Sequence, residues 1–203
     1  MNPLVSVIIP NYNHARYLEQ RLDSVFNQTY QNFEVIFLDD CSTDNSLEII
    51  EKYKDDPHLS RIVVNETNSG SPFKQWNKGF NLVKGDLVWI AESDDFCELS
   101  FLEEMIPAFI SDVVLAFTSY VRYYEESDTY VRPKVGRVAY HSGVRFIKTR
   151  MARECFIHNA SGVVFRKNVL EDLPDDYLRY IQCGDYGMEE SFHRREQCIF
   201  NNR

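Results

Sequence analysis

The pattern of apolar and polar positions changes period several times within the first hundred residues. Residues 4–9 (LVSVII) form a nearly continuous, β-branched apolar run, which is typical of a strand buried on both faces of a parallel sheet. Pro10 is expected to end this strand. From residue 14 to 26 the apolar side chains recur at helical spacing, and Glu19 and Asp23 fall outside the apolar face. The segment therefore predicts a strand, a loop and a helix.

The same unit recurs along the chain up to about residue 91. Each further apolar run is rich in β-branched or aromatic residues, and capping or first-turn residues open the helices between the runs. The predicted strands span residues 33–38, 61–65 and 87–91, and the predicted helices begin at residues 42–44 and 71–72. This alternation predicts an α/β fold, in which a mostly parallel sheet with right-handed crossovers is flanked by helices.

After residue 100 the regular alternation ends. We expect a helix over residues 100–110, a mixed segment over 113–124, a strand or strand pair over 156–165, and a helix or turn over 175–183. These shorter elements predict a smaller mixed lobe. We therefore divide the chain into an α/β core at residues 1–110 and a second lobe at residues 111–203 that shares the same hydrophobic core.

Polar residues gather at the carboxyl ends of three predicted strands, at residues 10–13, 39–42 and 92–95. Ligands of open α/β sheets bind beyond the carboxyl ends of the strands. Because parallel strands end at the same edge of the sheet, these three segments should lie close together. The sequence therefore predicts one binding site that is built from all three.

The acidic loop, Glu92-Ser93-Asp94-Asp95, directly follows the fourth predicted strand. Its three carboxylates repel one another, and a divalent cation relieves that repulsion. Hard carboxylate oxygens favour Mn²⁺ or Mg²⁺, which keep coordination places for water and for substrate phosphates. The alternative interpretation is a solvated turn in which Asp95 caps a helix.

The other two segments carry groups that suit a nucleotide. Asp39 and Asp40 can accept hydrogen bonds from a nucleobase N–H or from ribose hydroxyls, although helix capping is the alternative. Tyr12 can stack on a base or simply pack locally. Residues 68–70 (NSG) precede a helix start, where backbone N–H groups favour an anion. Neither a P-loop sequence nor a dinucleotide fingerprint is present in the chain.

Charge and cysteine content narrow the class of protein. The formal net charge of −9 over 203 residues argues against a nucleic-acid partner, because phosphate-backbone binding requires clustered Lys and Arg. The five cysteines form no CxxC pair, which favours reduced thiols in a cytoplasmic protein. No apolar stretch approaches the ~20 residues that span a bilayer. The sequence does not decide whether the protein contacts the inner face of a membrane peripherally.

Four segments resemble the inverting glycosyltransferases of family 2, which have the Rossmann-like GT-A fold. They are VSVIIPNYNHARYLEQRLDSVFNQTYQNFEVIFLDDCSTDNS at residues 5–46, NETNSG at 65–70, WNKGFNLVKGDLVWIAESDD at 76–95 and CGDY at 183–186. The resemblance implies a nucleotide-sugar-binding core and an acceptor-side lobe. It further implies the metal-dependent, inverting transfer of a sugar from a UDP- or other NDP-sugar to a polysaccharide or lipid-linked acceptor.

The resemblance also implies roles for particular residues. Asp95, together with Asp94, is expected to bind the metal. Asp185 is expected to be the general base that deprotonates the acceptor hydroxyl, although without the resemblance it is read as part of an ordinary Gly-Asp turn. His158 and Asn159 are expected to border the acceptor pocket. The expected nucleotide-binding residues are Pro10, Asn11, Tyr12, Asp40, Asn68, Gly70 and Asp94.

Two departures from the family pattern affect these expectations. Glu92 stands where the family motif begins with Asp, a change that leaves oxygen ligation open. After Tyr186 the family continues with an apolar amphipathic helix, whereas this chain continues as GMEESFHRREQCIFNNR. We therefore expect a truncated or frame-shifted version of a longer enzyme. The alternatives are a catalytically impaired nucleotide-sugar-binding protein and a nucleotidyltransferase, which is disfavoured because no Gly-rich loop bearing Lys or Arg follows the first strand.

Overall fold

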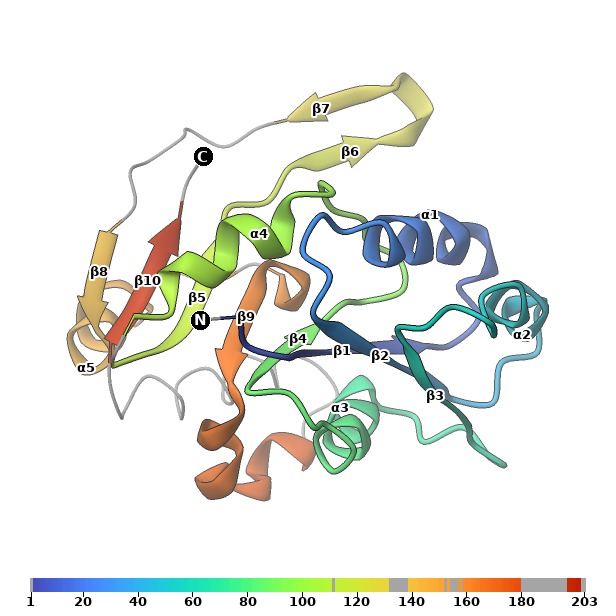
Figure 1. The fold of residues 1–203 in the computed structure, drawn as a ribbon, viewed down its shortest axis with the longest axis horizontal. Helices are drawn as coiled ribbons and strands as arrows, with labels where there is room; N and C mark the ends of the chain where they lie inside the picture. Colours follow the sequence, from blue (N-terminus) through green and yellow to red (C-terminus); the bar gives the residue numbers. More distant parts are fainter. Residues whose placement is uncertain are drawn as a thin grey trace.

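A mixed sheet of eight strands runs through the described part of the chain in the order β3-β2-β1-β4-β9-β5-β10-β8 (Figure 1). The computed structural model describes residues 2–110, 112–131, 139–151, 153, 157, 159–179 and 197–201. Strands β1 to β4 are parallel, β9 runs antiparallel to β4 and β5, and β8 runs antiparallel to β10. The strands are β1 Val5–Asn11, β2 Phe33–Asp39, β3 Leu59–Val64, β4 Leu87–Ile90, β5 Val113–Thr118, β8 Ala139–Ser142, β9 Val163–Arg166 and β10 Gln197–Asn201. The predicted α/β fold with a mostly parallel sheet is confirmed.

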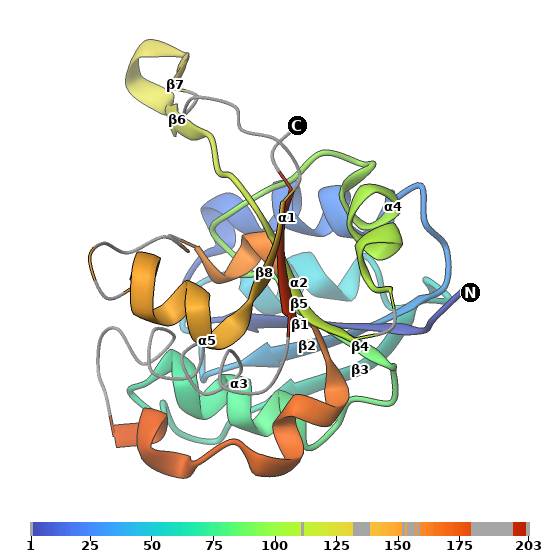
Figure 2. The same ribbon diagram turned by 90° about the vertical axis from the view of Figure 1, so that its left-hand side faces the viewer.

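Helices cover both faces of this sheet. Helices α1 and α4 lie on one side of the sheet and α3 lies on the other, as the two ribbon views show (Figures 1 and 2). The α-helices are α1 Ala15–Phe26, α2 Ser46–Glu51, α3 Pro72–Phe80, α4 Phe101–Met105 and α5 Gly143–Phe146. Short 3₁₀ turns occupy Ile106–Ala108, Glu125–Ser127, Ala160–Gly162, Lys167–Asp172 and Asp175–Arg179, and a π turn occupies Ile147–Met151. No described helix is long and apolar enough to cross a membrane.

The two faces of β1 supply two separate hydrophobic clusters. Val7 and Ile9 belong to the cluster that α1 covers, and Ile8 belongs to the cluster on the α3 side. This division follows from the strand geometry, because successive side chains point to opposite faces. Since both faces are covered by helices, β1 is apolar at nearly every position, as the sequence predicted.

Several predicted boundaries are wrong. The strand predicted over residues 156–165 is limited to Val163–Arg166, because the preceding residues 160–162 form a 3₁₀ turn. The helix predicted over 100–110 ends at Met105 and continues as a 3₁₀ turn containing Pro107, whose ring cannot supply a helical N–H. The helix or turn predicted over 175–183, by contrast, begins as predicted with a 3₁₀ turn at Asp175–Arg179, and its remainder lies outside the described residues.

The prediction that Pro10 ends the first strand is also wrong, since β1 continues to Asn11. The Ile8 carbonyl faces β4, where it accepts the Ala91 N–H, and Pro10 faces the same side two residues later. Strand β4 ends at Ile90, so this position of β1 has no ladder partner that needs an N–H. A proline is tolerated there for that reason.

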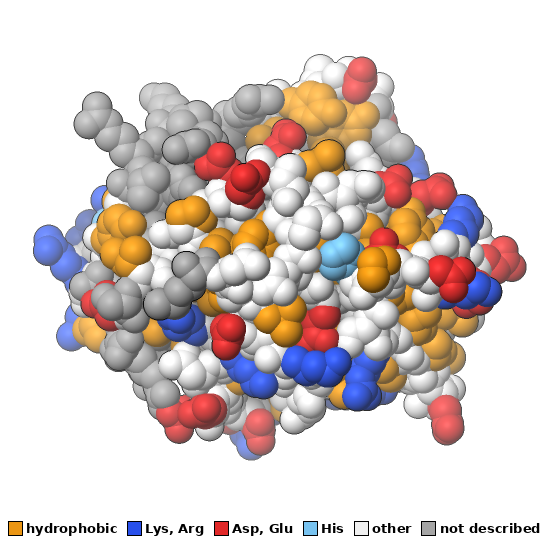
Figure 3. Space-filling model, viewed as in Figure 1, with side chains coloured by type: hydrophobic (Ala, Val, Ile, Leu, Met, Phe, Trp, Pro, Cys, Tyr) orange, Lys and Arg blue, Asp and Glu red, His pale blue; other side chains and the backbone are white. Residues whose placement is uncertain are grey.

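A two-stranded hairpin stands apart from the main sheet. It consists of β6 Arg122–Tyr124 and β7 Thr129–Val131, and all six residues are exposed. The hairpin projects from the body of the molecule (Figures 1 and 2). Hydrophobic side chains gather over it in the space-filling view (Figure 3).

Candidate active site

The loops after β1, β2 and β4 meet at the carboxyl end of the parallel strands, as predicted. The Asp40 N–H donates to the Asn11 carbonyl at 2.9 Å, which joins the first loop to the second. His14 Nδ1 and Ser93 Oγ lie 2.8 Å apart, which joins the first loop to the acidic loop. The sheet thus brings together three segments that are separated by about 30 and 50 residues in sequence.

At the end of β1, the Asn11 side chain is buried and faces the second loop. Its amide nitrogen donates to Asp39 Oδ2 at 2.9 Å and to Ser42 Oγ at 3.1 Å. Its buried Oδ1 has no hydrogen-bond partner within the described residues. Tyr12 follows and is 44% exposed. The end of β1 therefore offers one uncommitted acceptor and one accessible aromatic ring.

Asp40 at the end of β2 organises the segment that leads into α3. Its Oδ1 accepts from Asn65 Nδ2 at 2.6 Å, from the Ser69 N–H at 2.9 Å and from Gln75 Nε2 at 2.7 Å. Its Oδ2 accepts one bond, from Ser69 Oγ at 2.7 Å. Oδ2 accepts fewer hydrogen bonds than Oδ1, so it retains capacity for a further donor.

The helix-capping alternative is wrong for both Asp39 and Asp40. Asp39 Oδ1 accepts the Ser42 N–H at 2.8 Å, which is a local side-chain turn. Asn45, and neither aspartate, occupies the N-cap position of α2. Asp40 instead binds groups that lie 25 to 35 residues further along the chain.

Residues 68–71 form a turn before α3 that is held by hydrogen bonds within it. The Gly70 N–H donates to Asn68 Oδ1 at 2.6 Å, and Gly70 has a φ of 70°, which favours glycine. Lys74 Nζ donates to the Ser69 carbonyl at 2.9 Å and so supports the turn. The buried atoms Ser71 Oγ and Gln75 Oε1 have no partner in the part of the chain that the structure describes.

The acidic loop does not cap a helix. Helix α4 begins at Phe101, with Ser100 at its N-cap position, so the capping interpretation of Asp95 is wrong. Asp95 Oδ2 accepts from Asn159 Nδ2 at 2.8 Å and from Ser161 Oγ at 2.6 Å. Asp94 is exposed. The loop is thus anchored through Asp95 to the 3₁₀ turn before β9, while Asp94 faces solvent.

Glu92 differs electrostatically from its two neighbours. Burial raises the pKa of its carboxyl to about 8, and the charges of Asp94 and Asp95 act in the same direction. Trp76 Nε1 donates to Glu92 Oε1 at 2.7 Å. Near neutral pH this carboxyl is therefore largely protonated, and the negative charge of the loop resides on the two aspartates.

Arg21 is a functional candidate that the sequence prediction missed. Its side chain is fully buried, Nε donates to the Glu92 carbonyl at 2.8 Å, and Nη2 donates to Ser161 Oγ at 3.2 Å. Nη2 lies 3.9 Å from Asp95 Oδ2. The sequence held a signal, because Arg21 is three residues after Leu18 and four before Val25, on the apolar face of α1.

The residues of the acidic loop fit a divalent cation that is bound jointly by the protein and by a diphosphate ligand. Among the described residues no three His, Cys, Asp or Glu side chains converge on a preformed metal cage. Asp94 and Asp95 nevertheless present two carboxylates, and Asp95 is held through Oδ2, which leaves Oδ1 to face a ligand. Mg²⁺-like ions commonly bind through one or two carboxylates plus substrate phosphates and water.

The acceptor-side predictions are only partly within the described residues. Asp185 and His158 lie outside them. Asn159 lies beside the acidic loop, where its Nδ2 binds Asp95 and its Oδ1 accepts the Ser161 N–H at 2.7 Å. The structure therefore brings Asn159 to the predicted metal ligand.

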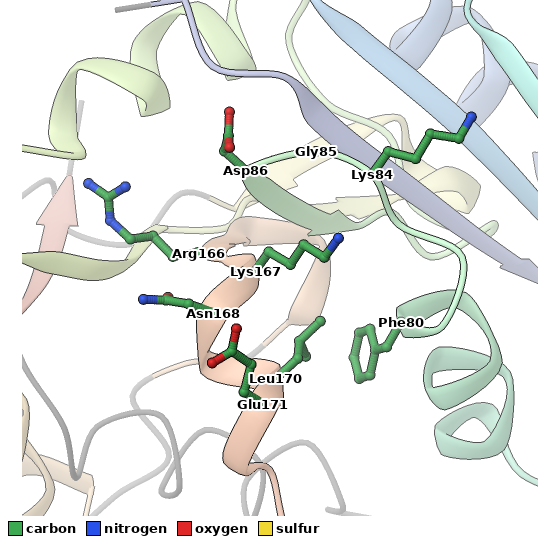
Figure 4. A pocket seen from close by; sticks show the side chains of 9 residues that line it. All are labelled: Phe80, Lys84, Gly85, Asp86, Arg166, Lys167, Asn168, Leu170 and Glu171. Atoms are coloured by element: carbon green, nitrogen blue, oxygen red, sulfur yellow. The ribbon is translucent and has the colours of Figure 1, made fainter.

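A cavity of about 520 Å³ lies elsewhere, at the amino end of β4 (Figure 4). Its lining cations already have protein partners. Lys167 Nζ donates to the Val83 carbonyl at 2.8 Å, and Arg166 Nε donates to the Val113 carbonyl at 2.7 Å. Lys84 Nζ pairs with Glu34 at 3.2 Å. Because the acidic loop follows the opposite end of β4, this cavity is separate from the candidate active site.

Comparison with known proteins places this geometry in a family. A sequence profile described as "Glycosyl transferase family 2" matches residues 6–173. Glycosyltransferase GlyG of Streptococcus pneumoniae is 35% identical over 131 residues, which cover 63% of this chain and 42% of GlyG. Poly(ribitol-phosphate) beta-N-acetylglucosaminyltransferase TarS of Staphylococcus aureus is 40% identical over 116 residues, which cover 54% of this chain and 20% of TarS. The chain thus matches less than half of the length of either relative.

Solved structures share the fold over nearly the whole chain. The crystal structure of TarS 1–349 has a TM-score of 0.75 at 25% identity, and the match covers 98% of this chain and 58% of that one. The same TarS segment has been solved with UDP and with UDP-GlcNAc, at TM-scores of 0.74 and 0.65 and 22% identity. Mannosyltransferase PcManGT of Pyrobaculum calidifontis, in complex with GDP-Man and Mn²⁺, has a TM-score of 0.68 at 19% identity, covering 98% of this chain and 55% of that chain.

Proposed function

Because this chain belongs to glycosyl transferase family 2, we propose that it transfers a sugar from a UDP- or other NDP-sugar to a saccharide-containing acceptor, with inversion at the anomeric carbon. One observation supports this function above the others. The acidic loop is joined through Ser93 to the loop after β1, and the end of β1 is joined to the end of β2 by the Asp40 N–H bond to the Asn11 carbonyl. At this junction the buried Asn11 Oδ1 has no hydrogen-bond partner among the described residues. A divalent cation and a nucleotide can therefore be held by adjoining loops.

The nucleotide is proposed to bind at the ends of β1 and β2. Asn11 Oδ1 and Asp40 Oδ2 both have capacity for a donor, and a uracil or guanine ring supplies N–H groups. Tyr12 is exposed enough to stack on the base. Pro10, Asn68 and Gly70 shape the same region, the last two through the turn before α3. TarS, whose fold this chain shares, was crystallised with UDP and with UDP-GlcNAc.

Mn²⁺ or Mg²⁺ is proposed to be held by Asp95 and Asp94 together with the donor diphosphate. When bound, the ion would stabilise the negative charge that grows on the departing diphosphate. Of this chain's own groups, Asp95 is oriented by the turn at residues 159–161. The carboxylates of Asp94 and Asp95 supply the negative charge that the cation would balance, and the fully buried Arg21 guanidinium lies 3.9 Å from Asp95 Oδ2.

The acceptor is proposed to approach between the acidic loop and the β6–β7 hairpin. The Phe96 ring, next to Asp95 in sequence, contacts Tyr123 edge to face with ring centroids 6.2 Å apart. Tyr123 in turn stacks on Tyr130 at 4.8 Å. Phe96, Tyr123 and Tyr130 are 42%, 38% and 55% exposed. Exposed aromatic patches commonly mark binding sites, and their flat apolar faces suit the C–H faces of sugar rings.

Asp185 is proposed to be the general base that deprotonates the acceptor hydroxyl, and His158 is proposed to border the acceptor pocket. The assignment of Asp185 follows from the family resemblance. Asn159 has its amide engaged by Asp95 and by the Ser161 backbone, which favours a role in holding the acidic loop over direct contact with the acceptor.

A donor panel with a metal control tests the proposed function. The protein is incubated with UDP-GlcNAc, UDP-glucose or GDP-mannose, each with Mn²⁺ or with EDTA, and nucleoside diphosphate release and thermal shifts are measured. We expect one donor to raise the melting temperature with Mn²⁺ and to release its nucleoside diphosphate. Binding without release in the presence of oligosaccharide acceptors would indicate an impaired binding protein. Pyrophosphate release would indicate a nucleotidyltransferase, and equal binding in EDTA would refute the metal assignment.

A further inference from the structure

We propose that Ser161, held in place by Arg21, is a positioning residue that orients Asp95 for metal binding. This inference rests on the proposed function, because it concerns the residue that is proposed to bind the cation. Ser161 comes from the turn Ala160–Gly162, and Arg21 comes from α1. They are 140 residues apart in sequence and meet directly beneath the acidic loop.

The hydrogen bonds of Ser161 determine where its hydroxyl proton points. Its Oγ accepts the Glu92 N–H at 3.0 Å and Arg21 Nη2 at 3.2 Å. Both partners are donors without an acceptor atom, so neither can receive the proton. Asp95 Oδ2, at 2.6 Å, is left as the acceptor. One donated and two accepted bonds use the full capacity of a hydroxyl, so Ser161 has a single orientation.

This orientation constrains the Asp95 carboxylate. Oδ2 receives the Ser161 hydroxyl and Asn159 Nδ2. Two donors from one short turn fix the plane of the carboxylate and direct Oδ1 away from the turn. Carboxylates that bind metals are commonly oriented by such outer hydrogen bonds, and loss of an outer partner typically costs 10- to 100-fold in metal affinity.

Arg21 holds Ser161 and the backbone of the acidic loop in place from the buried side. Its guanidinium joins the Glu92 carbonyl to Ser161 Oγ through two different nitrogens. It also lies over the Trp89 ring, with its central carbon 5.8 Å from the ring centroid. Trp89 Nε1 donates to the Ser161 carbonyl at 2.8 Å, so Ser161 is held at both its backbone and its hydroxyl.

A serine in the same sheet supplies a matched control. Ser6 in β1 is also buried, donates to one carboxylate, Glu34, at 2.7 Å, and accepts the Lys84 and Gly85 N–H groups at 3.1 and 2.8 Å. It therefore has the same hydrogen-bond count as Ser161 but lies near the amino end of β1. Ser6→Ala should lose stability for the same physical reason and leave metal binding unchanged.

The test measures Mn²⁺ affinity by electron paramagnetic resonance with saturating UDP, and UDP affinity in EDTA. We expect Ser161→Ala to weaken Mn²⁺ binding about tenfold, with UDP affinity in EDTA unchanged, and Ser161→Thr, which keeps the hydroxyl, to restore most of the loss. Arg21→Lys keeps the charge but not the two-nitrogen bridge, so it should weaken Mn²⁺ binding by a similar factor. Asn159→Ala, at a less buried position, should also weaken binding and serves if Ser161→Ala does not fold.

The outcomes separate this inference from the proposed function. If wild type binds Mn²⁺ with UDP and folded Ser161→Ala binds it equally well, the positioning role is refuted and the proposed function stands. If Ser6→Ala and Ser161→Ala lose Mn²⁺ affinity to the same extent, the effect is general destabilisation and the inference is again refuted. If wild type binds no Mn²⁺ with UDP, the metal assignment of the proposed function fails, and the inference fails with it.

Discussion

Replacing Glu92 by glutamine should remove a pH dependence of stability that the burial of this carboxyl introduces into the metal-free protein. Burial, reinforced by the charges of Asp94 and Asp95, raises its pKa from 4.5 to about 8. A glutamine keeps an oxygen for the Trp76 Nε1 hydrogen bond but does not ionise. The difference between wild type and Glu92→Gln therefore isolates the ionisation of this one group.

The direction and size of the effect follow from the two pKa values. Below pH 4.5 the carboxyl is protonated in both states and carries no penalty. Between pH 4.5 and 8 the unfolded chain loses the proton while the folded protein keeps it, so the free energy of unfolding falls by up to ~1.4 kcal/mol per pH unit. The full interval sets a ceiling of about 5 kcal/mol. Glu92 as a whole residue is half-buried rather than fully buried, so we expect a loss of a few kcal/mol, complete above pH 8.

The assay is urea unfolding of both proteins in EDTA at pH 5, 6, 7, 8 and 9. Relative to wild type, Glu92→Gln should gain stability steadily as the pH rises. Glu34→Gln is a control whose difference in stability from wild type should stay nearly constant from pH 5 to 9, because the contribution of Glu34 changes only below its unfolded pKa of about 4.5. Burial alone would raise the pKa of Glu34, but hydrogen bonds from Ser6 and Lys84 outweigh it and lower the pKa. The stability that Glu34 contributes is thus present above the unfolded pKa and lost as the pH falls. A constant difference between wild type and Glu92→Gln from pH 5 to 9 would refute the reasoning.

Three further predictions concern binding and transfer. Asp95→Asn should weaken Mn²⁺-dependent UDP binding at least tenfold while leaving binding in EDTA unchanged, as measured by calorimetry; retained Mn²⁺ dependence would contradict the ligand role. Asp185→Asn should bind donor and Mn²⁺ like wild type but lose at least a hundredfold in transfer rate, and a wild-type rate would show that the general base lies elsewhere. Tyr123→Ala and Tyr130→Ala should raise the KM for a saccharide acceptor several-fold and leave the donor KM unchanged, whereas an equal rise in both would point to a general structural effect.

Local patterns were sufficient to predict the first half of the fold. The run at residues 4–9 and its repeats fall in β1, β2, β3 and β4, because strands covered on both faces must be apolar at almost every position. The carboxyl ends of parallel strands meet at one edge, so the positions of the polar loops alone predicted where they would gather. The second half was harder, since short strands such as β9 acquire their boundaries from pairing with β4 and β5.

The sequence by itself therefore determined the α/β architecture and the meeting of the acidic loop with the loops after β1 and β2, both of which depend on spacing along the chain. Only the tertiary structure decided how that loop is held. Arg21 meets Ser161 across 140 residues, and Asp40 meets Gln75 across 35. The raised pKa of Glu92 likewise comes from burial beneath other elements. Hydrogen bonds between distant residues and the loss of solvent around a carboxyl exist only once the helices and the sheet have packed, so no local pattern encodes them.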